Sequence, residues 1–327
     1  MEQPTATPGR GREPGTKTLR ERLRGRDFRR KLFAWGMLAP ILLWFLIYMF
    51  VPILMVVGYS FTNAHMAYRT FKFVGLAQYV KVFTNDPIVP IALLNTIRAV
   101  VYIMPVTVVL ATLSAAAMNL QKNRWREFFT FSFFLPSVIS AVAIALIWNW
   151  LYHPNFGLLN ALMKAAGLPP QPFLTSSGQA LQAISVIEVW SIVGYYSVVI
   201  LAAIRGIDLS LYEAARIDGA SEASQLRHVT LPMIRPALLF VGVMSTIASF
   251  MVFTPVKVLT DGTPGTSTMV LMLLIMNNGI KNSNIGYASA LSLVLLVLIL
   301  IVSFAQWAAS REPGPGAKIR KTGRKSK

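Results

Sequence analysis

Six apolar stretches in this chain are each long enough to cross a lipid bilayer as a helix. A bilayer core about 30 Å thick requires roughly 20 consecutive, mostly apolar residues. Because backbone polar groups cannot remain unpaired in lipid, each stretch is expected to be helical. The stretches are Leu32–Phe61, Ile91–Leu120, Phe128–Tyr152, Leu181–Ile204, Met233–Leu259 and Ile285–Ala309. The sequence therefore predicts an all-α membrane domain, residues 32–309, with six transmembrane helices.

Proline occurs in or near four of these stretches, at Pro52, Pro105, Pro136 and Pro255. Proline lacks an N–H group and clashes with the preceding turn, so the helices are expected to bend there.

The composition agrees with a membrane protein and excludes several kinds of site. Only 13% of the residues are charged, whereas a typical soluble domain has about 25%. The chain contains no cysteine, which excludes disulfides, thiolate catalysis and cysteine-ligated zinc. The three histidines have no metal-ligand spacing, and no group of residues resembles a catalytic site, so no metal and no enzyme activity are predicted.

The net charge of +18 is concentrated at the chain ends, with ten basic residues before position 32 and seven after position 310. With both termini in the cytoplasm, the inner segments hold 24 basic residues and the outer loops hold six. The positive-inside rule therefore places residues 1–31, expected to be disordered, and residues 310–327 in the cytoplasm. Since no basic stripe crosses a folded segment, nucleic acid binding is not expected.

Residues 208–232 form a polar segment between the fourth and fifth apolar stretches. Ser210 and Glu213 have capping-box spacing, which predicts a helix from Leu211 to Asp218 that ends at Gly219. Ser221 is predicted to cap a second short helix. The segment combines alanines with acidic side chains, which favours docking into a protein groove over the alternative of a helix lying in anionic headgroups.

Residues 213–232 read EAARIDGASEASQLRHVTLP. This run resembles the E-A-A motif of binding-protein-dependent ABC importer permeases, E-A-A-x-x-D-G-A-S-x-x-x-x-x-x-x-I-x-L-P. Other stretches, such as FFLPSVISAVAIALIWNWLYHPNFGLLN at 133–160, resemble sugar permeases of the maltose and glycerol-3-phosphate type. The resemblance covers residues 33–308 and implies the type I ABC importer fold in the plasma membrane of a prokaryote.

In that family the motif is the coupling helix, which sits in a cleft of a cytoplasmic ATPase subunit. By position, the resemblance assigns ATPase coupling to Glu213, Ala214, Ala215, Arg216, Asp218 and Gly219. It also implies a second homologous permease subunit, two ATP-binding subunits, an external solute-binding protein and a sugar substrate. A phosphate-binding loop requires Gly-Lys, and this dipeptide does not occur in the chain. ATP and Mg²⁺ are therefore expected on the partner subunit, with no cofactor on this chain.

Candidates for the substrate path lie mainly in the fourth stretch. Ser185, Glu188, Ser191 and Tyr195 recur every three or four residues, as a polar stripe on one helix face. A carboxylate inside a membrane is costly, so Glu188 is expected to face a cavity or a partner, although solvation by outer headgroups or a bond to another helix is also possible. Weaker candidates are Asn95, Ser245 and Ser249, because small polar groups in membrane helices more often hold helices together.

The sequence thus predicts a permease subunit of an ATP-driven sugar importer. The alternative is a self-sufficient, ion-coupled secondary transporter, which would be expected to carry several ionisable groups within the membrane. Only Glu188 and Arg98 are obvious there.

Overall fold

The computed structural model describes residues 19–66, 71–121 and 123–310. The chain divides into two units, Met1–Met55 and Val56–Lys327. The first apolar stretch forms α1 (Leu19–Phe45), a π-helical turn (Leu46–Phe50) and α2 (Val51–Ser60). The π-helical turn ends just before Pro52, which cannot donate the helical hydrogen bond expected at its position.

Helix α1 begins at Leu19, so residues 19–31 of the expected disordered tail are helical. The run from Leu19 to Arg30 contains six arginines and two leucines, which are good helix formers. Residues 1–18 and 311–327, the rest of the two predicted tails, lie outside the described residues.

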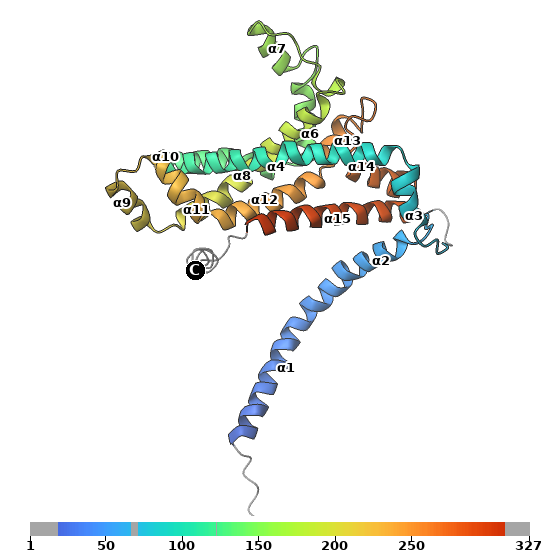
Figure 1. Ribbon diagram of the computed structural model, residues 1–327, viewed down its shortest axis with the longest axis horizontal. Coiled ribbons are helices and arrows are strands. Elements are labelled where there is room, and N and C mark those ends of the chain that lie inside the picture. Colours follow the sequence, from blue (N-terminus) through green and yellow to red (C-terminus); the bar gives the residue numbers. More distant parts are fainter. Residues whose placement is uncertain (1–18, 67–70, 122, 311–327) are drawn as a thin grey trace, which may run out of the picture. The chain divides into compact units, whose positions relative to one another are not determined.

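Within the second unit, four long helices form a bundle: α4 (Ile88–Leu120), α8 (Ala180–Arg205), α12 (Arg235–Phe250) and α15 (Ile285–Ser310). Helix α4 packs against α8 and α12, and α12 packs against α15 (Figure 1). Helix α4 continues through Pro105 without interruption. Alanines at the crossing of α4 with α8, such as Ala111 and Ala115, are fully buried, and such small side chains let membrane helices approach closely.

The remaining helices connect the bundle. They are α3 (Ala77–Val80), α5 (Asn123–Phe134), α6 (Ala141–Leu151), α7 (Leu158–Ala165), α9 (Leu209–Ile217), α10 (Glu222–Gln225), α11 (Leu231–Met233), α13 (Thr254–Leu259) and α14 (Leu271–Met276). The segment α9–α11 lies at one end of the bundle and α3 at the opposite end (Figure 1). The turns Lys81–Asn85, Leu226–Thr230 and Asn277–Lys281 are π-helical, and Phe173–Thr175 is a 3₁₀ turn.

The third predicted span, Phe128–Tyr152, is not one straight helix. Arg124–Val138 and Ala141–Leu151 meet at an angle of 99°, so the described residues contain five candidate spans and one bent pair. Pro136 lies in the 3₁₀ turn Leu135–Val138 at the bend. The Ser137 hydroxyl donates to the Phe134 carbonyl at 2.6 Å and so satisfies a group that the broken helix leaves free.

Two other boundaries that the sequence predicts differ from those of the helices in the structure. The fifth span ends as α12 at Phe250 and resumes as α13 at Thr254, with Pro255 in the first turn of α13. Residues 260–284, which connect the fifth and sixth apolar stretches, contain α14, in which Leu271, Leu273 and Leu274 are buried. Helix α14 packs against α4 and α15, and its apolar run is too short to be recognised as a span.

Candidate functional site

The α9–α11 segment is a helix, a glycine turn and a second short helix. Asp208, not Ser210, caps α9: its carboxylate accepts a hydrogen bond from the Ser210 N–H at 2.9 Å. This backbone hydrogen bond lowers the pKa of Asp208, which keeps a negative charge at the positive end of the helix dipole. The predicted capping box at Ser210 is therefore wrong, because an acceptor two residues earlier in the chain already caps the helix.

The turn after α9 has the predicted form. Gly219 has φ = +78°, a left-handed conformation that glycine adopts without steric cost. Ser221 caps α10 by accepting from the Ser224 N–H at 3.3 Å. Both sequence predictions for this turn are confirmed.

The tip of this segment is exposed. The side chains of Glu213, Ala214, Arg216 and Asp218 are exposed, as is Gly219, while Ala215 is half-buried. Sequence reasoning missed Ile217, whose side chain is 87% exposed.

The base of the same segment is anchored in the bundle. Ile207 and Ile234 belong to a buried cluster that includes Met118 of α4 and Ile200 of α8, with Tyr212 packed against it. The Tyr212 and Thr230 hydroxyls also lie 2.9 Å apart and share one hydrogen bond, in which either can be the donor. The base of the segment is therefore packed against the ends of α8 and α12.

The second candidate site is a cavity of about 330 Å³ lined by the bent pair α5–α6, by α8 and by Pro255. Glu188, Ser191 and Tyr195 line it together, from one face of α8. The Ser191 hydroxyl donates to the Ile187 carbonyl at 2.8 Å. Within the described parts of the chain, no side chain or backbone N–H donates to the Glu188 carboxylate. The cavity thus combines a carboxylate and a hydroxyl with aromatic faces.

The other sequence candidates lie elsewhere. Ser185 is buried and donates to Leu181, Ser245 donates to Gly242, and Ser249 donates to Ser245, each to a backbone carbonyl of its own helix. The Asn95 amide donates to the carbonyls of Thr266 and Met269, at 2.9 and 3.1 Å. The structure brings none of these four side chains to the cavity that Glu188 lines.

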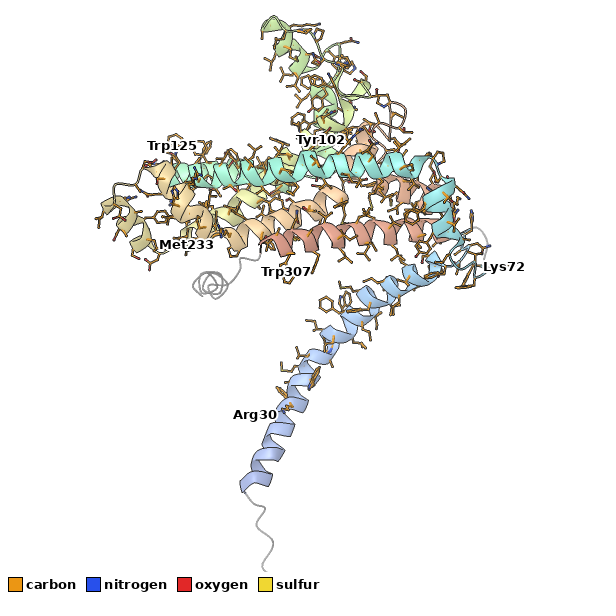
Figure 2. All side chains as sticks on the ribbon, viewed as in Figure 1. Arg30, Lys72, Tyr102, Trp125, Met233 and Trp307 are labelled. Carbon is orange, nitrogen blue, oxygen red and sulfur yellow. The ribbon has the colours of Figure 1, made fainter. Side chains whose placement is uncertain are left out.

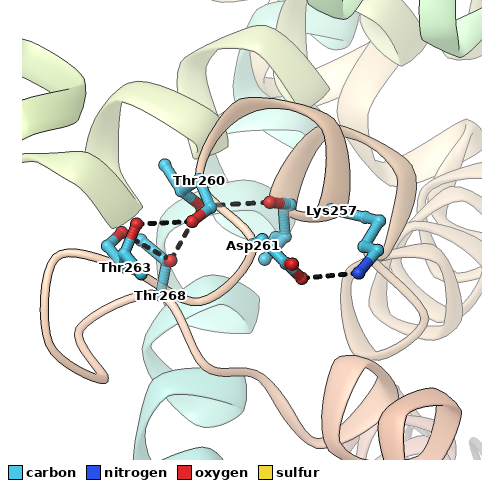
Figure 3. Close-up of polar contacts among 6 residues, drawn as sticks. Lys257, Thr260, Asp261, Thr263 and Thr268 are labelled. Atoms are coloured by element: carbon cyan, nitrogen blue, oxygen red, sulfur yellow. Dashed lines mark hydrogen bonds and ion pairs between the residues drawn. The ribbon is translucent and has the colours of Figure 1, made fainter. Parts of the chain in front are cut away.

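Asn95 instead holds the loop between α13 and α14 onto α4. The Thr96 hydroxyl assists by accepting from the Leu271 N–H at 2.8 Å. Within the loop, the hydroxyls of Thr260 and Thr268 lie 2.8 Å apart, and Lys257 pairs with Asp261 at 2.7 Å (Figure 3). This loop is therefore held both by hydrogen bonds to α4 and by polar contacts among its own residues.

We expect Asn95→Leu to loosen this loop. The substitution leaves two carbonyls without their donor, at a cost of about 1–3 kcal/mol, so amide hydrogens of residues 266–271 should exchange faster. Thr112→Val on the same helix is the control, because the Thr112 hydroxyl donates within α4, to the Val108 carbonyl. Equal exchange in Asn95→Leu and in the parent protein would contradict the role assigned to Asn95.

Gly194 of α8 sets the close contact between α8 and the bend. A Cβ atom at this position would overlap the Phe133 carbonyl oxygen. We expect Gly194→Ala to push α5 away from α8, to cost about 1–3 kcal/mol as overpacking does, and to lower the melting temperature of the purified protein in detergent. Gly242→Ala is the matched control, because no atom lies within 4 Å of its added Cβ. An unchanged melting temperature for Gly194→Ala would contradict the contact.

Comparisons with known proteins agree with these features. Residues 104–311 match the family described as binding-protein-dependent transport system inner membrane component. The chain is 34% identical to the probable ABC transporter permease YurN of Bacillus subtilis, over 84% of this chain and 95% of YurN. It is 33% identical to the lactose transport system permease LacF of Rhizobium radiobacter, over 85% of this chain and 94% of LacF.

A solved structure has the same fold. It is a bacterial alginate ABC transporter in complex with its alginate-bound periplasmic protein, and one of its chains superposes with a TM-score of 0.76 at 25% identity. The superposition covers 88% of this chain and 96% of that one. This likeness supports the type I importer architecture predicted from the E-A-A motif. The protein belongs to the family of inner-membrane components of binding-protein-dependent transport systems.

Proposed function

We propose that this chain is one of two membrane subunits of an ATP-driven sugar importer. The observation that carries the proposal is the α9–α11 segment, which has an exposed tip of the E-A-A sequence and a base packed into the bundle. Its Glu213, Ala214, Ala215, Arg216, Asp218 and Gly219 contact a separate ATPase subunit, and Ile217 adds an apolar anchor. The α9 end of the bundle then faces the cytoplasm, in agreement with the basic residues counted on that side.

Transport would be driven by rearrangement of the bundle. ATP-driven closure of the ATPase subunits moves the tip, and the packed cluster at Ile207 and Ile234 transmits this movement to α8 and α12. The cavity between α8 and the bent pair α5–α6 lies against the moving helix α8. Rigid elements that are coupled in this way can alternate between two arrangements.

The cavity beside Glu188 is proposed to hold part of the substrate path. A sugar presents hydroxyl donors to a carboxylate and apolar C–H faces to aromatic rings. Glu188 provides the acceptor, and Tyr195 and Phe134 provide rings in the same cavity. Relatives with sugars in their names, the lactose permease and the diacetylchitobiose permease of Streptomyces coelicolor, support a carbohydrate substrate.

The test is uptake by proteoliposomes that contain the chain together with its partner permease, its ATPase and its solute-binding protein. We expect uphill sugar uptake only when ATP is supplied on the side of α9 and the binding protein is on the other side. Uphill uptake by the chain alone, abolished by an uncoupler and indifferent to ATP, would instead establish the ion-coupled secondary transporter.

A further inference from the structure

A second hollow, of about 480 Å³, lies between α5 and α8. Its lining has two parts. Arg126, Glu127 and Arg205 are its charged residues, and Phe131, Val198 and Leu201 are among its apolar residues. The sugar path proposed above uses the other cavity, so this hollow has no role in it.

The position of Arg205 on its helix sets the depth of the hollow in a bilayer. Helix α8 has 26 residues and is therefore about 39 Å long at 1.5 Å per residue. A bilayer core is about 30 Å thick, so the ends of α8 reach the headgroups. Arg205 is the last residue of α8, and Val198 lies roughly 10 Å deeper, two helical turns before it.

Trp125 supports the same depth. Its ring is 60% exposed, and it lies at the α9 end of the bundle (Figure 2). Tryptophan side chains collect at the membrane interface. Trp125 directly precedes Arg126, so the charged part of the hollow lies at the level of lipid phosphates.

The chemistry of the lining matches a phospholipid better than a sugar. Two arginines against one glutamate give a net positive charge, and a guanidinium group binds a phosphate with paired hydrogen bonds. The apolar part offers a surface for an acyl chain but only one hydroxyl, from Thr130. A sugar would leave its own hydroxyls unpaired against Phe131, Val198 and Leu201.

We propose that this hollow binds an anionic phospholipid, with the phosphodiester at Arg126 and Arg205 and an acyl chain along Phe131, Val198 and Leu201. The inference rests on the membrane placement given under the proposed function but not on ATP coupling. Lipid retention and sugar uptake therefore test the two proposals separately.

The test is native mass spectrometry of the chain, purified with its partner subunits and equilibrated in detergent micelles that contain phosphatidylcholine and phosphatidylglycerol in equal amounts. We expect the parent protein to retain phosphatidylglycerol preferentially. Because each substitution removes a guanidinium that hydrogen-bonds the phosphate directly, the double variant Arg126→Gln, Arg205→Gln should retain phosphatidylglycerol at least about tenfold less. Arg124→Gln, the matched control, removes a charge from the same helix but outside the hollow, and retention should be unchanged.

Three results would overturn the proposal. The first is equal retention of phosphatidylglycerol by the parent protein and the double variant. The second is an equal loss in Arg124→Gln, which would indicate only a general effect of charge. The third concerns the variant Thr130→Cys. The parent chain has no cysteine, so this variant carries a single one, at the hollow. Complete cross-linking of this cysteine to another subunit would show that protein, and not lipid, covers the hollow.

Discussion

Gly219→Pro is expected to abolish sugar uptake while the protein remains in the membrane at its normal level. Proline fixes φ near −65°, whereas Gly219 has φ = +78°, so the variant cannot form the turn between α9 and α10. Since the base of the segment is packed separately through Ile207 and Ile234, the bundle should still assemble. The measurement is uptake of labelled sugar, normalised to the amount of the chain in the membrane fraction.

Gly167→Pro is the matched control for this experiment. Gly167 also has a left-handed backbone, with φ = +73°, and no atom lies within 4 Å of an added Cβ there. It follows α7, outside the α9–α11 segment, and its substitution should leave most of the uptake intact. Glu213→Lys, which reverses a charge on the exposed tip, should also abolish uptake and reduce co-purification of the ATPase subunit. Normal uptake by both Gly219→Pro and Glu213→Lys would contradict the coupling role.

Glu188→Leu should give the second large effect, a loss of sugar uptake of about tenfold or more. A hydrogen bond to a charged group contributes about 1.5–3 kcal/mol, and Glu188 provides the carboxylate of its cavity. The loss should be measured as uptake at low sugar concentration, in proteoliposomes whose ATPase activity is recorded in parallel.

Ser185→Ala is the control for Glu188. It lies one turn earlier on α8, and its hydroxyl donates to Leu181 within the helix, so uptake should be unchanged. If Glu188→Leu transports sugar at the parental rate, the cavity is not part of the substrate path.

The α9–α11 segment was largely predictable because helix caps and glycine turns have strong local sequence preferences. An Asp-Gly pair between two short polar helices favours a left-handed glycine, and Gly219 adopts it. The start of α9 was not predictable to the residue, because both Asp208 and Ser210 are good caps. In the structure α9 begins at Leu209, and the Asp208 carboxylate accepts from the Ser210 N–H.

Hydropathy located the spans but not their breaks. Residues 128–152 are apolar on both sides of the bend, so no change in composition marks it. Pro136 predicted a bend there, but not one of 99°. Near the bend, Gly194 lies close to the Phe133 carbonyl, a contact between distant segments that a single sequence does not reveal.

The polar stripe on α8 was predictable and the opposite wall of its cavity was not. The spacing of Glu188, Ser191 and Tyr195 places them on one helix face, and the structure finds all three at one cavity. The residues opposite them, such as Phe134 and Pro136, come from a segment about 50 residues earlier in the chain. The contact of Asn95 with the loop was not predictable for a similar reason, because its partners Thr266 and Met269 lie 171 and 174 residues away.

A single cysteine at the tip of α9 tests the central claim most directly. The chain has no cysteine and the Ile217 side chain is 87% exposed, so Ile217→Cys provides one unambiguous attachment point for a short bifunctional cross-linker. In an assembly that transports sugar, the account predicts a cross-link between this cysteine and the ATPase subunit. If the transporting assembly instead gives no such cross-link, or couples the cysteine only to the external binding protein, α9 does not connect this chain to its source of energy.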